Sequence, residues 1–147
     1  MEVVVDNQEK LQESSRQDPT AFTPAQLDDF ALYKRFRSGG TITAQEAGQM
    51  IPSRDEFAGL WRYLAGRNGE VVDTPVRLAR RVAQEADLWE SSLRTLICLD
   101  VMEELDLLTV TQEEGGALRV KLQKRKGKGK VNLFDAPLIQ KLQKMSE

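Results

Sequence analysis

The sequence predicts a mainly helical α+β fold that includes a small antiparallel sheet. Several segments repeat apolar residues at the three- and four-residue spacing of an amphipathic helix, and residues that suit helix caps precede them. Between residues 107 and 122 the pattern changes to alternation on both sides of a glycine pair, which is typical of a β-hairpin. The chain has 147 residues, which suits one domain with flanking segments, because a chain of roughly 150 residues buries about 70% of its unfolded surface.

The first part of the chain is predicted to be a polar segment followed by a helical lead-in. Residues 1–21 show little apolar periodicity, so we expect a linker or a poorly ordered segment. Residues 22–52 contain two helix starts. Thr23 can cap a helix and is followed by a proline, which suits the first helical position, while Thr43 has Glu46 at capping-box spacing.

Residues 53–122 are predicted to form the main domain. Ser53 and Thr74 each precede helical periodicity, and their hydroxyls suit the capping position. The expected elements, in order, are a helix from Ser53, an extended piece at residues 70–73, helices from Thr74 and from Ser91 to Leu105, and strands at residues 107–111 and 117–122 joined by a tight turn. This is the element order of a winged helix-turn-helix domain.

In a DNA-binding domain of that kind the third helix lies in the major groove, and residues near its N-terminus face the bases. Here those residues are Ser91, Ser92 and Arg94, of which only Arg94 reads guanine effectively. The later part of this helix carries the carboxylates of Asp100, Glu103, Glu104 and Asp106. Because carboxylates repel phosphates, a structural or protein-contact role is favoured over sequence readout for this helix.

Charge is unevenly distributed, although the formal net charge is only −2. Residues 1–30 carry two basic and seven acidic side chains, and residues 31–118 carry ten basic and fourteen acidic ones. Residues 119–147 carry nine basic and two acidic ones. Such asymmetry indicates a polyanion partner or an internal electrostatic contact.

Two groups of basic residues account for the predicted DNA contacts. Arg77, Arg80 and Arg81 share one helix face, where they either position a phosphate backbone or pair with nearby carboxylates of Glu70, Asp73 and Glu85. The segment KLQKRKGKGK contains Lys121, Lys124, Arg125, Lys126, Lys128 and Lys130 and no acidic residue. Glycine-spaced lysines can follow a phosphate chain without reading sequence, although a solvated stretch with no partner has the same composition.

Apolar residues return after this segment, so residues 123–147 are predicted to be a basic loop and a C-terminal helix. Asp135 is expected to cap that helix, and Pro137 suits its first turn. Elsewhere, Phe57, Trp61 and Cys98 fit apolar helical stripes and are expected in the core. Trp89 stays open between burial and the stacking of a base.

Composition excludes several classes of catalysis. The chain has no histidine and one cysteine, so it cannot form a Ser-His-Asp arrangement, a histidine zinc face or an intramolecular disulfide. No glycine-rich phosphate loop or convergent acid pair is present, and we predict a noncatalytic chain without metal or cofactor. No apolar run approaches the ~20 residues of a membrane span, and the N-terminus lacks a signal pattern, so a cytoplasmic protein with no membrane partner is expected.

Three stretches carry a family resemblance: IPSRDEFAGLWRYL at residues 51–64, LDVMEELDLLTV at residues 99–110 and GKVNLFDAPLIQKL at residues 129–142. They resemble the C-terminal region of RecJ-type single-strand-specific exonucleases, as found in Firmicutes-like bacteria. The resemblance runs from about Tyr33 to Leu142, and Ala136 stands where a serine is expected before the proline.

The resemblance implies a role beside an enzyme that degrades single-stranded DNA from its 5′ end in repair and recombination. In that family divalent metals are held by Asp-His-His catalytic domains, and no residue of this chain matches those ligands. The chain is thus expected to be a noncatalytic C-terminal accessory domain, with Met1 either a native start or a boundary inside a longer protein. Its expected partners are single-stranded DNA bound without sequence preference, a repair or single-strand-binding protein, and the nuclease's own catalytic domains.

Two alternatives stay open. A stand-alone winged-helix transcription regulator would need a dimer and a base-reading third helix. A protein-interaction module would use the acidic helix and the basic segment to bind partners.

Overall fold

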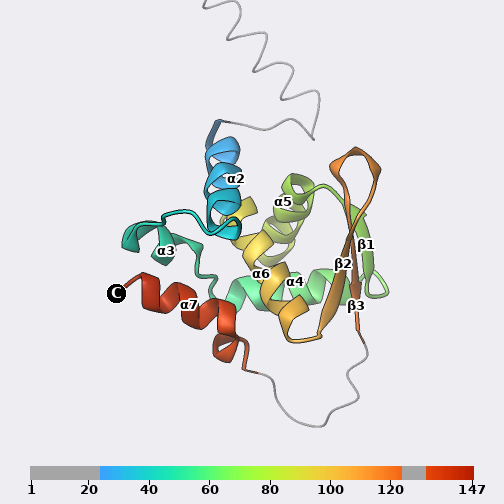
Figure 1. Cartoon of the computed structure of the whole chain (residues 1–147). Coiled ribbons are helices and arrows are strands. Elements are labelled where there is room, and N and C mark those ends of the chain that lie inside the picture. Colours follow the sequence, from blue (N-terminus) through green and yellow to red (C-terminus); the bar gives the residue numbers. More distant parts are fainter. Residues whose placement is uncertain (1–23, 124–131) are drawn as a thin grey trace, which may run out of the picture.

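The structure is a computed structural model that describes residues 24–123 and 132–147, with side chains described from residue 29 onward. It is mainly helical with a small three-stranded antiparallel sheet, so the predicted α+β class is confirmed (Figure 1). In chain order the elements are α2 (Pro24–Arg37), α3 (Ala44–Met50), α4 (Arg54–Ala65), β1 (Glu70–Asp73), α5 (Pro75–Ala86), α6 (Ser92–Glu104), β2 (Leu108–Gln112), the 3-10 turn η1 (Glu114–Gly116), β3 (Leu118–Leu122), the 3-10 turn η2 (Leu133–Asp135) and α7 (Pro137–Met145).

Local capping determines where most of the helices begin. Thr43 and Ser53 each form a capping box, with Glu46 and Glu56 respectively. The Thr74 hydroxyl caps α5, whose first residue is a proline. These contacts satisfy backbone N–H groups that have no partner inside the helix, and the helix starts predicted at these three residues are confirmed.

The C-terminal helix α7 begins differently from the prediction. Asp135 does not cap it: Asp135 lies in η2, and Ala136 occupies the cap position without a side-chain hydrogen bond. Instead, the carboxylate of Glu104, at the end of α6, accepts a hydrogen bond from the Leu138 backbone N–H at 3.0 Å. A side chain from a distant helix therefore accepts the hydrogen bond that a local capping residue accepts in the other helices.

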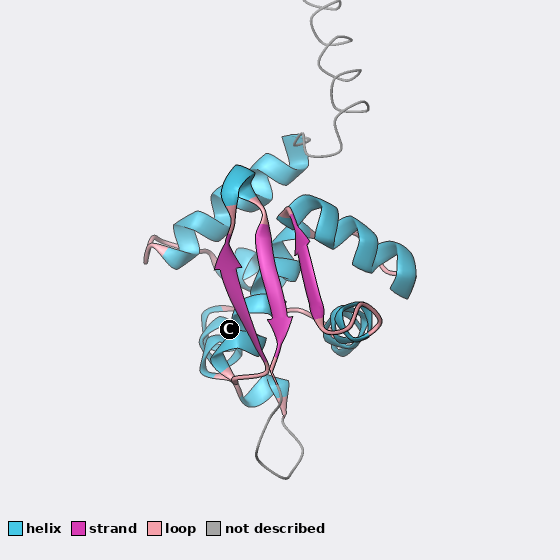
Figure 2. Ribbon diagram, turned by 90° about the vertical axis from the view of Figure 1, so that its right-hand side faces the viewer, coloured by secondary structure: helices cyan, strands magenta, loops and turns pink. Residues whose placement is uncertain are grey.

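The sheet has the strand order β1-β3-β2 (Figure 2). Val120 of β3 lies opposite Val71 on one side and Val110 on the other. The predicted hairpin is confirmed, and Gly115 and Gly116 hold its turn at φ of 74° and 79°, a region that favours glycine. One sheet face packs on the helices, and Figure 2 shows the other face uncovered in front of them.

Helix α6 lies at the centre of the molecule, packed against α2, α4, α5 and β2 (Figure 1). Its buried side chains point in every direction around its axis and include Ser92, Leu93, Ile97, Cys98, Leu99, Val101 and Met102. The same core includes Phe36 of α2 and Ile139 of α7. The lead-in and the C-terminal helix therefore share one core with residues 53–122.

Candidate functional site

The N-terminus of α6, where the base-reading residues are predicted, is used by the fold itself. The Ser91 hydroxyl caps the helix by accepting from the Arg94 backbone N–H at 3.1 Å. Ser92 is 1% exposed, so its prediction as a DNA contact is not supported: its hydroxyl does not reach the surface. The Arg94 guanidinium donates from Nε to Glu56 at 2.7 Å, which ties α6 to α4.

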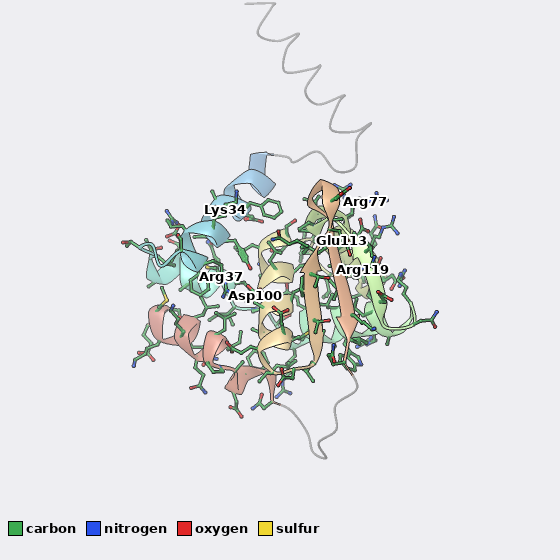
Figure 3. All side chains as sticks on the ribbon, turned by 45° about the vertical axis from the view of Figure 1, so that its right-hand side comes forward. Lys34, Arg37, Arg77, Asp100, Glu113 and Arg119 are labelled. Atoms are coloured by element: carbon green, nitrogen blue, oxygen red, sulfur yellow. The ribbon has the colours of Figure 1, made fainter. Side chains whose placement is uncertain are left out.

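The carboxylates farther along α6 are also engaged. Asp100 accepts a hydrogen bond from the Tyr33 hydroxyl at 2.5 Å, and the Arg37 guanidinium lies 3.9 Å away (Figure 3). Glu103 accepts from the Val110 backbone N–H at 2.9 Å, on the outer edge of β2. With Glu104 holding α7, three of the four predicted phosphate-repelling carboxylates join α6 to neighbouring elements.

Burial changes the acidity of the contact between α2 and α6. Burial raises the pKa of the Asp100 carboxyl, an effect that the Tyr33 hydrogen bond and the nearby Arg37 charge oppose. Burial, together with the hydrogen bond to Asp100, also raises the pKa of the Tyr33 hydroxyl. Tyr33 therefore stays a proton donor to Asp100 at neutral pH, and α2 covers the face of α6 that this pair joins.

The arginines of α5 take part in ion pairs, as one of the two open interpretations requires. Arg77 and Arg81 each place Nε 3.4 Å from a different oxygen of Asp73, whose side chain is 9% exposed. Arg80 pairs with Glu90 at 3.2 Å. Because two guanidinium groups share one carboxylate, the Asp73 cluster keeps an excess positive charge.

The other two predicted partners of these arginines pair elsewhere. Glu85 binds Arg67 at 2.6 Å, and Glu70 binds Arg119 at 2.7 Å. Arg119 also donates to Glu113 at 2.5 Å, next to the hairpin turn (Figure 3). Sequence proximity therefore identified one partner of these arginines correctly, Asp73, and missed Glu90.

The basic segment lies mostly outside the described residues. Lys121 is exposed on the outer face of β3. Lys124, Arg125, Lys126, Lys128 and Lys130 lie outside the described part of the chain. The residue before them, Gln123, donates its backbone N–H to the Leu107 carbonyl at 2.9 Å.

A groove that the sequence did not predict lies between α4, the end of α6 and η2. Its volume is about 600 Å³, and its walls include Arg54, Phe57, Trp61, Leu107, Leu133 and Phe134. Phe57 and Phe134 meet edge to face at 5.8 Å between ring centroids. Among the described residues that line the groove, none is acidic.

The prediction that Trp61 is buried is wrong, because its side chain is 41% exposed. The buried stripe of α4 is centred on Leu60 and Leu64, and Trp61 lies one residue's rotation, about 100°, beyond Leu60. Phe57 and Cys98 are buried as predicted, at 1% exposure each, and burial raises the pKa of the Cys98 thiol well above its usual range. Trp89 is 90% exposed, in the turn between α5 and α6.

A second groove, of about 560 Å³, lies between α2, α6 and the β2–β3 hairpin. Apolar residues such as Leu96 and Leu99 form part of its lining, and three carboxylates, Asp100, Glu103 and Glu113, lie around it. Among the described residues that line it, Lys34 is the one lysine (Figure 3). The described lining of this groove is therefore mainly acidic, whereas that of the groove beside α4 carries a basic residue, Arg54.

Known proteins do not add to this picture. None of the family models, curated proteins or solved structures compared with the chain matches it. Within residues 24–123 and 132–147, no three side chains of metal-binding type come together, and we derive no metal-dependent step for this chain. No helix in the described ranges has both the length and the apolar character needed to cross a membrane.

Proposed function

We propose that this chain is a noncatalytic accessory domain of a RecJ-like exonuclease that assists the binding of single-stranded DNA without reading its sequence. The observation that carries the proposal is the concentration of positive charge in residues 121–130, which hold six basic side chains and no acidic one. Lysines and arginines that neutralise phosphates bind any sequence, and this affinity falls as salt rises. The three family-like stretches support the link to the nuclease.

The domain that presents this segment is, in our proposal, a winged helix-turn-helix. Two observations support this. The elements from α4 to β3 follow the order helix, strand, helix, helix, strand, turn, strand, and β3 pairs between β1 and β2 with the glycine turn as the wing.

The contacts of α6 favour DNA binding without sequence preference. Arg94 is committed to Glu56, Ser92 is buried, and α2 packs over the helix. A base-reading helix needs an exposed face of side chains that can enter the major groove. This weighs against the stand-alone transcription regulator.

The Asp73 cluster supplies a second candidate phosphate contact. Arg77 and Arg81 are 36% and 48% exposed, and each meets Asp73 through Nε. A guanidinium carries five N–H donors, so the pairing with Asp73 orients both groups while donors stay available to a phosphate. Arg80 is balanced by Glu90 and is the weaker candidate of the three.

The test is a titration of the full chain with single-stranded and duplex oligonucleotides over a range of salt. Changing Lys128→Gln and Lys130→Gln together is expected to weaken binding and to reduce the slope of log affinity against log salt by about 0.7 for each single-strand phosphate that is no longer neutralised. The slope is the informative quantity, because it counts charges and is insensitive to apolar contacts.

The matched control changes Lys141→Gln and Lys144→Gln on α7. This variant alters the net charge by the same amount, but its two lysines lie outside the basic segment. Equal effects of the two pairs would show that only net charge matters, and the absence of binding by the wild type at low salt would contradict the proposal.

A second candidate function, recruitment of a protein partner, is favoured by the groove between α2, α6 and the hairpin. Its apolar lining and its carboxylates Asp100, Glu103 and Glu113 suit a basic amphipathic segment. Such a partner would be a repair protein or the nuclease's own catalytic domains. Partner binding without DNA affinity at any salt would favour this candidate.

A further inference from the structure

The outward side of α4 combines an aromatic ring with two arginines. Arg54 lies seven residues before Trp61 and Arg62 directly follows it, and all three side chains are exposed. Seven residues are about two helical turns, so Arg54 and Trp61 share a face, and Arg62 lies about 100° farther round the helix. The exposed side of α4 therefore places a large aromatic surface beside two cations.

These two arginines differ from the others on the domain. Among the described residues, Arg54 and Arg62 form no ion pair, whereas Arg67, Arg94 and Arg119 each bind a carboxylate. An arginine without a carboxylate partner keeps its full charge and its donors for an external anion. Arg54 and Arg62 therefore keep donors that an external anion can use, although the exposed carboxylate of Asp55 lies on the same side of α4.

The groove beside these residues has the volume and the aromatic lining that suit a flat apolar group. It has a volume of about 600 Å³, and Trp61 and Phe134 contribute aromatic surface to it. Single-strand binding proteins combine such aromatic surfaces, on which bases stack, with nearby cations that hold the phosphates. The part of the lining that the structure describes contains no acidic residue, which suits a polyanion.

The other exposed apolar features do not share this charge pattern. Trp89 lies between Asp87 and Glu90 in the chain. The groove over α6 is lined by Asp100, Glu103 and Glu113. Carboxylates at these positions repel phosphates. The outward side of α4 carries one exposed carboxylate, Asp55, beside two arginines, so of these three surfaces it fits nucleic acid best.

The chain also brings both ends of the basic segment to this groove. Gln123, the last described residue before the segment, donates its backbone N–H to Leu107, which lines the groove. Asn132, the first described residue after it, lines the groove directly. The site itself consists of described residues, and the two residues that flank the segment lie at its border.

We infer that the outward side of α4 binds a nucleobase of single-stranded DNA, with Trp61 as the stacking surface and with Arg54 and Arg62 positioned for the flanking phosphates. The inference rests on the proposed function and deepens it, because it locates the preference for an unpaired strand. Bases in a duplex are stacked on one another and do not expose a face to Trp61. A site of this kind accepts any base, since every base has a π-face.

The test uses the two tryptophans as matched probes. In Trp89→Phe, Trp61 is the only tryptophan, and its fluorescence is expected to be quenched by a short oligothymidylate and not by the duplex of the same length. Trp61→Ala is expected to lower affinity for the single strand about tenfold, whereas Trp89→Ala changes it less than about twofold.

Salt dependence separates stacking from charge. Trp61→Ala removes no charge, so its salt slope stays that of the wild type, while Arg54→Gln with Arg62→Gln lowers the slope. Trp61→Phe keeps an aromatic ring and controls for any loss of packing in the alanine variant. It is expected to retain more affinity than alanine does.

Three results would overturn the inference. If Trp61→Ala binds single strands as tightly as the wild type while Lys128→Gln with Lys130→Gln weakens binding, the proposed function stands and the site on α4 is excluded. A shift of Trp61 emission with an acidic peptide containing leucine and phenylalanine, but not with oligothymidylate, assigns the groove to a protein. No binding of single strands by the wild type at low salt removes the proposed function as well.

Discussion

The surroundings of α6 and the outward side of α4 use charge in opposite ways. Around α6 the charged side chains form contacts within the protein: Arg94 binds Glu56, Asp100 binds Tyr33, and Glu104 binds α7. On α4, Arg54 and Arg62 form no ion pair with another described residue. A charged residue at an expected functional position therefore indicates function only once its partners in the fold are known.

The difference has a physical basis in burial. Helix α6 is surrounded by other elements, and a polar group in such a place needs a hydrogen-bond partner to offset its loss of water. Helix α4 has only one buried side, so the side chains on its other face meet water and need no internal partner. We expect changes in the first region to affect stability and changes in the second to affect binding.

The largest effect is expected from the centre of α6. Ile97 is 0% exposed, and Ile97→Ala is expected to lower the free energy of unfolding by about 2–5 kcal/mol, because it removes buried methyl groups and leaves a cavity. Chemical denaturation of the wild type and the variant measures this. Trp61→Ala is the contrast, and a larger loss of stability there than in Ile97→Ala would break the comparison.

A smaller effect is expected at the junction of α6 and α7. Glu104→Ala leaves the Leu138 backbone N–H without its carboxylate, and loss of a helix cap costs about 1 kcal/mol. Glu114→Ala, in the exposed hairpin turn, is the control, because it removes the same charge without removing a cap. Equal unfolding midpoints for the two variants would show that the Glu104 contact does not hold α7.

The smallest effect is expected from the ionisation of Asp100, which makes the free energy of unfolding depend on pH. Because burial raises its pKa in the folded state above the usual 3.8, the folded protein binds the proton more tightly than the unfolded chain. This contribution to stability is therefore present at pH below 3.8 and is lost as pH rises through the folded-state value.

Asp100→Asn removes this titration while keeping a group that can accept the Tyr33 hydrogen bond. The unfolding free energy of the wild type, relative to the variant, should fall as pH rises from 3.8 toward neutrality. A difference that stays constant, or that grows with pH, would contradict the burial of this carboxylate.

Local features of this fold were predictable from sequence, because their causes lie within a few residues. The caps at Ser53 and Thr74, and the glycine turn of the hairpin, follow from side chains three positions apart or from allowed backbone angles. Phe57 and Cys98 were correctly predicted in the core because helical periodicity locates the centre of a buried stripe.

The site was less predictable, because its contacts join distant parts of the chain. Arg94 and Glu56 are 38 residues apart, and Tyr33 and Asp100 are 67 apart, so no local pattern indicates either pair. Trp61 lies at the edge of its stripe, where periodicity does not decide between burial and exposure. The signal that does distinguish it is the pair of arginines on the same exposed side of the helix.

The measurement that tests the account most directly is the affinity of the wild-type chain for short single-stranded oligonucleotides of different sequence as salt is varied. We expect binding at low salt that is nearly independent of sequence and stronger than binding to the matching duplex. The logarithm of the affinity should fall linearly with the logarithm of the salt concentration. Absence of binding at low salt, or a strong preference for one duplex sequence, would contradict it.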